Sequence, residues 1–173
     1  MPPAINLLSL YDLNFKEEIA ETAATIEGNA LLKATAIAQT CSTNCFADDS
    51  GLLVDALNGA PGVYSARYAG DQKNDSDNID KLLNALKGNE NRKAHFKTVM
   101  ALVLDGKEYM FEGMIHGVIT EERKGTNGFG YDPVFMPDGY SKTFAEMSLE
   151  EKNSISHRKI ALKKLLEFLD QVG

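Results

Sequence analysis

In the stretch Phe46-Ala47-Asp48-Asp49-Ser50-Gly51, two adjacent carboxylates follow a short apolar run and precede a Ser-Gly pair. We expect a strand over residues 45–47, so that both acids lie where the chain leaves a sheet. In open α/β sheets ligands bind at that position, and carboxylate oxygens there suit a hard cation such as Mg²⁺. The alternative is an acidic surface turn, because Asp, Ser and Gly all favour turns.

The composition bounds the class of protein. The 173 residues suit one domain, 1–173, and are 43% hydrophobic and 25% charged, as in soluble globular proteins. No apolar run reaches the ~20 residues that span a membrane, and the N-terminus lacks a signal-peptide pattern, so a cytoplasmic location is expected. Cys41 and Cys45 give no disulfide framework and a poor zinc site.

The net charge of −7, without a basic patch, argues against a broad nucleic-acid-binding surface. A phosphate-bearing partner is therefore expected to be small and held locally. Because the protein is acidic, a metal ion would help such a partner to approach.

Residue patterns predict strands and helices that alternate along the chain. Apolar periodicity, turn signals and caps indicate strands at 5–10 and 45–47, helices at 29–40, 76–87 and 156–170, and a hairpin of 99–104 and 108–119. Ser76 is the expected N-cap of the second helix, and Asp105-Gly106 is a strong hairpin turn. The mixture predicts an α/β or α+β sheet with helices packed on it.

A glycine-rich loop is the second candidate site. Residues 125–133 read Gly-Thr-Asn-Gly-Phe-Gly-Tyr-Asp-Pro, and three glycines in six positions let the backbone approach a ligand closely. Phe129 or Tyr131 could stack on a nucleobase, and Asp132 could read a base edge or orient a cation. The alternative is a flexible loop whose aromatic rings pack back on the core.

A basic cluster at residues 152–159 is the third candidate, and we expect it to open the last helix. A helix N-terminus that carries His157 and Arg158 suits an anion or an electron-rich carbonyl edge, and the guanidinium can donate two parallel hydrogen bonds. The alternative is a solvated basic face. A fourth candidate, Glu27, stands at the entry to the first helix, where a capping role explains a carboxylate equally well.

Together these segments resemble the Ham1-like inosine triphosphate pyrophosphatase family. The matching stretches, in the family's order and from about residue 5 onward, are Glu27-Gly28-Asn29-Ala30, Ala47-Asp48-Asp49-Ser50-Gly51, Gly59-Ala60-Pro61-Gly62-Val63-Tyr64-Ser65-Ala66-Arg67-Tyr68, Gly128-Phe129-Gly130-Tyr131-Asp132-Pro133 and Ser156-His157-Arg158. The third stretch is long enough to be highly specific.

The resemblance implies a two-lobed α/β fold around a long, mixed, twisted sheet with a central cleft, a homodimer, and Mg²⁺ dependence. The implied reaction converts ITP, dITP and XTP to the monophosphate and pyrophosphate, which cleanses the nucleotide pool. Asp49 resembles the catalytic acid and metal ligand. The implied substrate contacts are Ser50, Phe129, Gly130, Tyr131, Asp132, Lys152, His157 and Arg158.

Two departures from the family affect these expectations. Gly28 stands where many relatives carry a second Glu, so the metal role at this helix must fall to Glu27 or be absent. Relatives also open with a strand that ends in a Thr/Ser-x-Asn-x-x-Lys-like motif, followed by a helix. Because this sequence shows neither, we expect an N-terminally truncated chain with an unpaired sheet edge and impaired activity.

Three functions stay open at this point. The first is the pyrophosphatase. The second is a nucleotide-binding or structural dimer without catalysis, and the third is a related pyrophosphatase that acts on other modified nucleotides.

Overall fold

A single antiparallel sheet organises the molecule. The computed structural model describes residues 5–172, and the strand order is β1-β2-β3-β4 with every neighbouring pair antiparallel. The strands are Cys45–Val54 (β1), Lys93–Leu104 (β2), Lys107–Ile119 (β3) and Phe135–Pro137 (β4). The mixed sheet that the resemblance implies is therefore antiparallel throughout the described residues.

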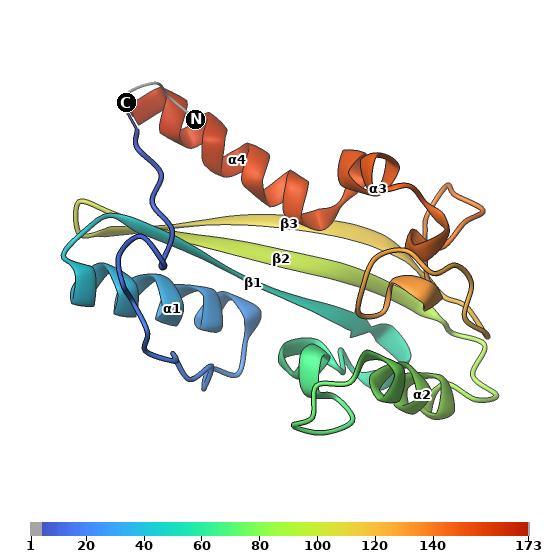
Figure 1. Ribbon diagram of the computed structural model, residues 1–173. Helices are drawn as coiled ribbons and strands as arrows, with labels where there is room; N and C mark the ends of the chain where they lie inside the picture. The colour runs from blue at the N-terminus through green and yellow to red at the C-terminus, as the bar shows by residue number, and fades with distance from the viewer. Residues whose placement is uncertain (1–4, 173) are drawn as a thin grey trace.

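Helices cover both faces of this sheet (Figure 1). They are α1 (Ile26–Cys41), α2 (Asp75–Ala85), α3 (Leu149–Ile155) and α4 (His157–Val172), with 3₁₀ turns at Asp55–Leu57, Gly62–Arg67, Asp132–Val134 and Phe144–Glu146. Helix α1 packs on β1 and β2, whereas α4 packs on β2 and β3 from the other face. No helix among the described residues is long and apolar enough to cross a membrane.

Strand β1 is longer than the sequence predicts. It continues through the two acids and the Ser-Gly pair to Val54. The predicted strand end at residue 47 is therefore wrong, and so is the alternative prediction of an acidic surface turn. The reason lies in β2, since a partner strand pairs with every residue of β1 and supplies the hydrogen bonds that a turn would have supplied. As the first strand in the order, β1 also forms an edge of the described sheet.

The predicted hairpin is confirmed and extends over both long strands. Asp105 and Gly106 have positive φ values of 51° and 76°, which a two-residue turn of type I′ requires. From this turn, β2 and β3 pair from Leu104↔Lys107 back to Lys93↔Val118.

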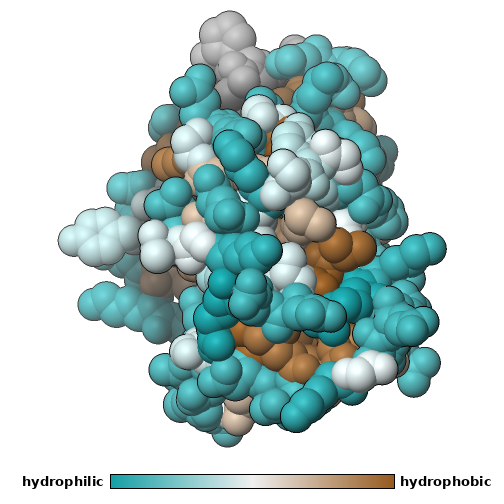
Figure 2. Space-filling model, turned by 90° about the vertical axis from the view of Figure 1, so that its right-hand side faces the viewer, coloured by the Kyte–Doolittle hydropathy of each residue, from teal (hydrophilic) through white to brown (hydrophobic). Residues whose placement is uncertain are grey.

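Two core regions divide the molecule into two lobes along the sheet. Toward the β2–β3 turn, α1 and α4 sandwich the strands. Toward the other end, Leu52 and Phe96 pack with Leu82 of α2 and with Phe135 and Phe144. Figure 2 views the molecule from this second end, where mostly hydrophilic side chains surround a patch of apolar ones.

Three further element predictions differ from the structure. Residues 5–10 form no strand, and Leu7, Leu8 and Tyr11 are exposed, because the backbone here closes a local turn, with Phe15 N–H donating to Leu10 O, instead of pairing with a strand. Helix α2 is capped by Asn74 rather than Ser76, since the Asn74 side chain accepts from the backbone N–H of Asp77. The basic cluster does not open one helix either, because the chain turns extended at Ser156 and separates α3 from α4.

Candidate functional site

Asp49 lies in the middle of β1 and points toward α1. Its Oδ1 atom accepts a hydrogen bond from Lys33 Nζ at 3.1 Å, and the same ammonium group donates to Glu21 Oε1 at 2.9 Å. The carboxyl of Asp49 is buried. Lys33 therefore holds two carboxylates, one from the sheet and one from the segment before α1.

Burial raises the pKa of Asp49 above its usual value, although the hydrogen bond and the charge of Lys33 act in the opposite direction. Burial also opposes the charge of Lys33, but the hydrogen bonds to Glu21 and Asp49 raise the pKa of this amine overall. The ammonium thus stays charged, and Asp49 is a carboxylate whose proton affinity is enhanced. Such a group is a candidate general base.

A second ion cluster lies on the same face of the sheet. Lys97 of β2 contacts Glu27 at the start of α1 and Glu112 of β3, the latter at 2.9 Å. Burial raises the pKa of Glu27, but its bond to Lys97 outweighs this and lowers that pKa overall. Glu27 thus pairs with an ammonium group rather than with Asp49, and its assignment as a metal ligand stays a prediction.

Asp48 and Ser50 point to the opposite face from Asp49, because side chains alternate along a strand. Asp48 Oδ2 accepts from Arg158 Nε of α4 at 3.3 Å, and Ser50 Oγ lies 2.6 Å from Thr98 Oγ1. The two adjacent acids therefore do not form a pair. One faces the α1 cluster, and the other orients an arginine on the far side of the sheet.

The glycine-rich loop is held in shape by one buried carboxylate. Asp132 Oδ2 accepts from the backbone N–H of Phe129 at 3.1 Å and from Lys152 Nζ at 2.5 Å. A side chain at position 128 would collide with this carboxylate. Gly128 also has a φ of +75°, which other residues rarely adopt, so both the space and the backbone conformation require glycine. Asp132 and Lys152 are thus a structural pair under the loop.

The ring of Phe129 is left open above that pair. It is 63% exposed, and it lies 4.6 Å from Lys152 Nζ and 5.9 Å from Arg158 Cζ, measured to the ring centroid. An exposed aromatic ring on an ordered loop, with two cations beside it, is suited to stack on a flat ligand.

His157 lies buried at the start of α4. Its ring stacks on Phe96, with centroids 4.9 Å apart and planes 10° from parallel. Burial, with help from Arg158 and Lys152, lowers the pKa of His157 to about 3, so the imidazole is neutral at physiological pH. Its Nδ1 atom is buried without a hydrogen-bond partner among the described residues. Buried polar atoms are normally paired, so this nitrogen is suited to bind a ligand atom.

The motif at residues 59–68 connects strand β1 with the glycine-rich loop. Ser65 Oγ accepts from the backbone N–H of Leu52 and donates to Gly62 O, which ties the motif to the edge of β1. Tyr131 OH donates to Ser65 O at 2.7 Å, which ties the glycine loop to the motif. The buried Asn78 of α2 holds the motif from below through its side-chain amide.

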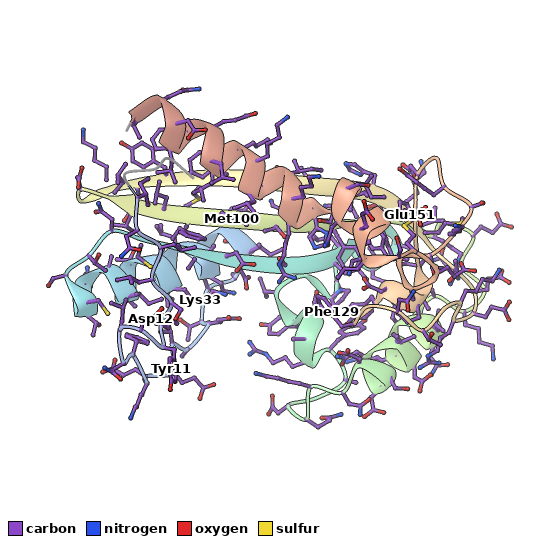
Figure 3. All side chains as sticks on the ribbon, turned by 45° about the horizontal axis from the view of Figure 1, so that its top comes forward. Tyr11, Asp12, Lys33, Met100, Phe129 and Glu151 are labelled. Carbon is purple, nitrogen blue, oxygen red and sulfur yellow. The ribbon has the colours of Figure 1, made fainter. Side chains whose placement is uncertain are left out.

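Two groups of predicted residues thus lie along β1. Figure 3 shows Lys33 near α1 and Phe129 toward the other end of the molecule, near α2. Asp49 belongs to the group at Lys33, and Phe129, Asp132, Lys152, His157 and Arg158 belong to the other group. Gly130 and Tyr131 lie in the loop, with Tyr131 buried and bonded to the motif. The sequence prediction missed Lys33 and Glu21.

The donor set around Asp49 consists of carboxylate oxygens that now surround an ammonium group. The described residues contain no cluster of three or more His, Cys, Asp or Glu side chains that could hold a metal ion. Asp49 and Glu21 nevertheless offer the hard oxygen atoms that a divalent cation prefers, at a place already occupied by positive charge. Two carboxylates are too few ligands for a six-coordinate cation, so a bound phosphate would have to supply further oxygen atoms.

Known proteins resemble this chain over almost its whole length. The chain is 59% identical over 169 residues to the dITP/XTP pyrophosphatase of Flavobacterium johnsoniae, which covers 98% of this chain and 88% of that protein. It is 49% identical to the Bacillus subtilis dITP/XTP pyrophosphatase, over 98% of this chain and 87% of that one.

A solved structure has a closely similar fold. The structure of the Staphylococcus aureus Ham1 protein superposes with a TM-score of 0.95 at 42% identity, over 99% of this chain and 90% of the other. The Ham1 family matches residues 2–168. With this match over almost its whole length, the chain belongs to the Ham1 family.

Proposed function

We propose that this protein is a nucleoside triphosphate pyrophosphatase that hydrolyses ITP, dITP and XTP to the monophosphate and pyrophosphate. The observation that carries the proposal is Asp49, a buried carboxylate whose pKa is raised and which is held by Lys33. The names of the related pyrophosphatases give the substrate class.

The group formed by Phe129, His157 and Arg158 is suited to bind a purine base that carries an oxygen atom at its six-position. Phe129 supplies a stacking surface, and Arg158 supplies hydrogen-bond donors beside it. His157 is neutral and therefore offers one ring N–H as a donor. Adenine presents an amino group at that position and would leave a donor unpaired, which costs about 1–3 kcal/mol for a buried group.

The group formed by Asp49 and Lys33 is suited to position a water molecule beside the phosphates of the substrate. Asp49 can accept a proton from water or orient it, because its carboxylate is buried and has an enhanced affinity for protons. Lys33 can move from Asp49 to a phosphate oxygen, which would free the carboxylate for this role. Mg²⁺, bound through Asp49 and the substrate's phosphates, would neutralise the charge that develops on them.

We also propose a cytoplasmic homodimer. Ser50 remains a predicted substrate contact, and its hydroxyl lies within hydrogen-bond distance of Thr98. Glu27 remains a predicted metal ligand, and its carboxylate pairs with Lys97.

The decisive experiment is Asp49→Asn, assayed by pyrophosphate release from ITP with Mg²⁺. The amide keeps the size of the side chain but cannot accept a proton, so we expect a fall in kcat of at least about a hundredfold. Asp170→Asn is the matched control, because Asp170 is exposed near the end of α4, and we expect its kcat to be nearly unchanged. Equal turnover by Asp49→Asn and the unmodified chain would refute the proposal.

A further inference from the structure

Two histidines stand side by side on the α1 face of the sheet. His95 of β2 and His116 of β3 are directly opposite each other in the strand register. Because side chains alternate along a strand, they share this face with Lys97, whose ammonium group contacts Glu27 at the start of α1. His95 is half-buried and His116 is exposed. The two imidazole rings are therefore neighbours that a solute can reach.

Helix α1 runs away from this histidine pair. Glu27 in its first turn contacts Lys97, and Lys33 later in the helix contacts Asp49. Asp49 pairs with the residue of β2 that lies four positions after His95. At ~3.4 Å per residue, the histidine pair is about 14 Å along the strand from Asp49. It is therefore separate from the group formed by Asp49 and Lys33.

A surface hollow adjoins the pair on the other side. The next residues of the two strands on this face are Lys93 and Val118, which are again directly opposite each other. Together with Asp55, which follows β1, they line the hollow. Water and small ions can approach the histidine rings from there.

The spacing of the two rings is suited to a shared metal ion. The ring centroids of His95 and His116 are 5.2 Å apart, and their planes are tilted by 38°, so the rings are not stacked face to face. A zinc ion about 2.0–2.1 Å from one nitrogen of each ring lies about 3.2 Å from each centroid, so a tetrahedral angle at the ion places the centroids about 5.2 Å apart. Rotation about χ2, which is a soft torsion in histidine, can turn one nitrogen of each ring toward the ion without moving the backbone.

His95 is in the protonation state that binds metals. Burial lowers its pKa, and the charges of His116 and Lys97 lower it further, whereas the carboxylates of Asp55 and Glu112 act in the opposite direction. The imidazole of His95 is therefore neutral at physiological pH. A metal ion binds only the neutral ring, so it has no proton to displace from His95.

We propose that His95 and His116 bind a zinc ion, with water molecules or a small anion as its remaining ligands. Residues 5–172 contain no group of three or more His, Cys, Asp or Glu side chains that could hold a metal ion, so this site has two protein ligands and is open to solvent. Imidazole nitrogen suits Zn²⁺, Cu²⁺ and Ni²⁺ rather than Mg²⁺ or Ca²⁺, and the tetrahedral spacing favours zinc among these ions. The bound ion links β2 to β3 and is distinct from the Mg²⁺ proposed at Asp49.

The test is a titration of the chain with zinc at neutral pH, followed by the NMR signals of the histidine ring nitrogens. The signals of His95 and His116 should shift together and give one dissociation constant. Loss of a partner that only orients a metal ligand costs about 10–100-fold in affinity, and loss of a ligand should cost no less. His95→Gln and His116→Gln should therefore each raise the dissociation constant for zinc, read at the remaining ring, at least about tenfold.

Cys45→Ser is the control variant, because Cys41 and Cys45 are free thiols that also bind zinc. It should leave the affinity measured at the two histidine rings unchanged, and circular dichroism should show that every variant is folded. Ring signals that zinc does not move would overturn the site, as would an unchanged dissociation constant in either histidine variant. Equal shifts with Mg²⁺ would overturn the assignment to zinc. No readout involves nucleotide hydrolysis, so the result is independent of the proposed activity.

Discussion

Lys33 occupies a position that helix geometry would give to an apolar side chain. It stands three residues after Ala30 and four before Ile37, both of which are buried against the sheet. A lysine in such a stripe must find a partner for its charge, and it does so in Asp49 and Glu21. This interruption of an apolar stripe is the signal in the sequence that could have identified Lys33.

The pKa of Asp49 should depend on this lysine. In Lys33→Met the hydrogen bond and the positive charge that hold this pKa down are removed, so it should rise further above the value in the unmodified protein. The measurement is a carbon-detected NMR titration of the Asp49 carboxyl group. Lys163→Met is the control, since Lys163 is largely exposed and forms an ion pair with Glu167 on α4. An unchanged or lower pKa in Lys33→Met would contradict the expectation.

His157 should make the fold sensitive to acid. Because its pKa is about 3 in the folded protein and about 6.5 when unfolded, only the unfolded chain takes up the proton in between, so stability falls as pH falls through this window. The loss approaches about 1.4 kcal/mol per pH unit. His157→Gln lacks this titration, so urea unfolding between pH 6 and 4 should show a shallower slope. Equal slopes for the two proteins would show that His157 is protonated in the fold.

At the scale of elements, local signals located the helices and the hairpin well. Periodic apolar residues predicted α1, α2 and α4 to within a few residues, because each helix buries one stripe. The Asp105-Gly106 turn fixed the hairpin register, because two adjacent residues with positive φ define a two-residue turn. Local signals failed for β1, whose Asp-Ser-Gly stretch favours a turn in isolation but is held extended by pairing with β2.

The contact between helix α2 and the glycine-rich loop should affect the KM for ITP. Asp75 Oδ2 accepts from the backbone N–H of Gly130 at 2.8 Å, which links the first turn of α2 to the loop. In Asp75→Ala this link is lost, and at about 0.5–1.5 kcal/mol for one hydrogen bond the KM for ITP should rise roughly twofold to tenfold with little change in kcat. Steady-state kinetics of pyrophosphate release would measure both constants.

Asp77→Ala is the matched control for this prediction. Asp77 is also an acid in the first turn of α2, but its side chain bonds to Gln72 rather than to the loop. A KM that rises equally in both variants would assign the effect to the helix terminus and not to the loop contact.

At the scale of the whole molecule, aromatic packing joins the site to the second core. Phe96 of β2 contacts His157 of α4, Phe135 of β4 and Phe144 of the adjoining 3₁₀ turn. The residues come from four parts of the chain and meet on one face of the sheet. The position of His157 therefore depends on the packing of this core.

Phe96→Ala and Phe129→Ala make the same chemical change in two environments. Phe96 is 8% exposed, so its loss should lower the free energy of unfolding by about 3–5 kcal/mol. Phe129 is 63% exposed, so its loss should leave stability nearly unchanged and should weaken ITP binding through lost stacking, by about 1–3 kcal/mol. Urea unfolding and isothermal titration calorimetry with ITP separate the two effects. Weakened stability in Phe129→Ala with unchanged ITP binding would contradict the stacking role.

The sequence by itself determined α1, α2 and α4, the hairpin turn, the family and the candidate residues of the Phe129 group, but not α3. These features depend on local periodicity, turn chemistry and motifs, all of which can be recognised from residues that are close together in the sequence. Only the tertiary structure decided that Asp48 and Asp49 face opposite sides of the sheet, that Lys33 holds Asp49, and that His157 is buried and neutral. Each of these depends on which strand or helix packs against the residue, and such contacts join segments that lie far apart in the chain.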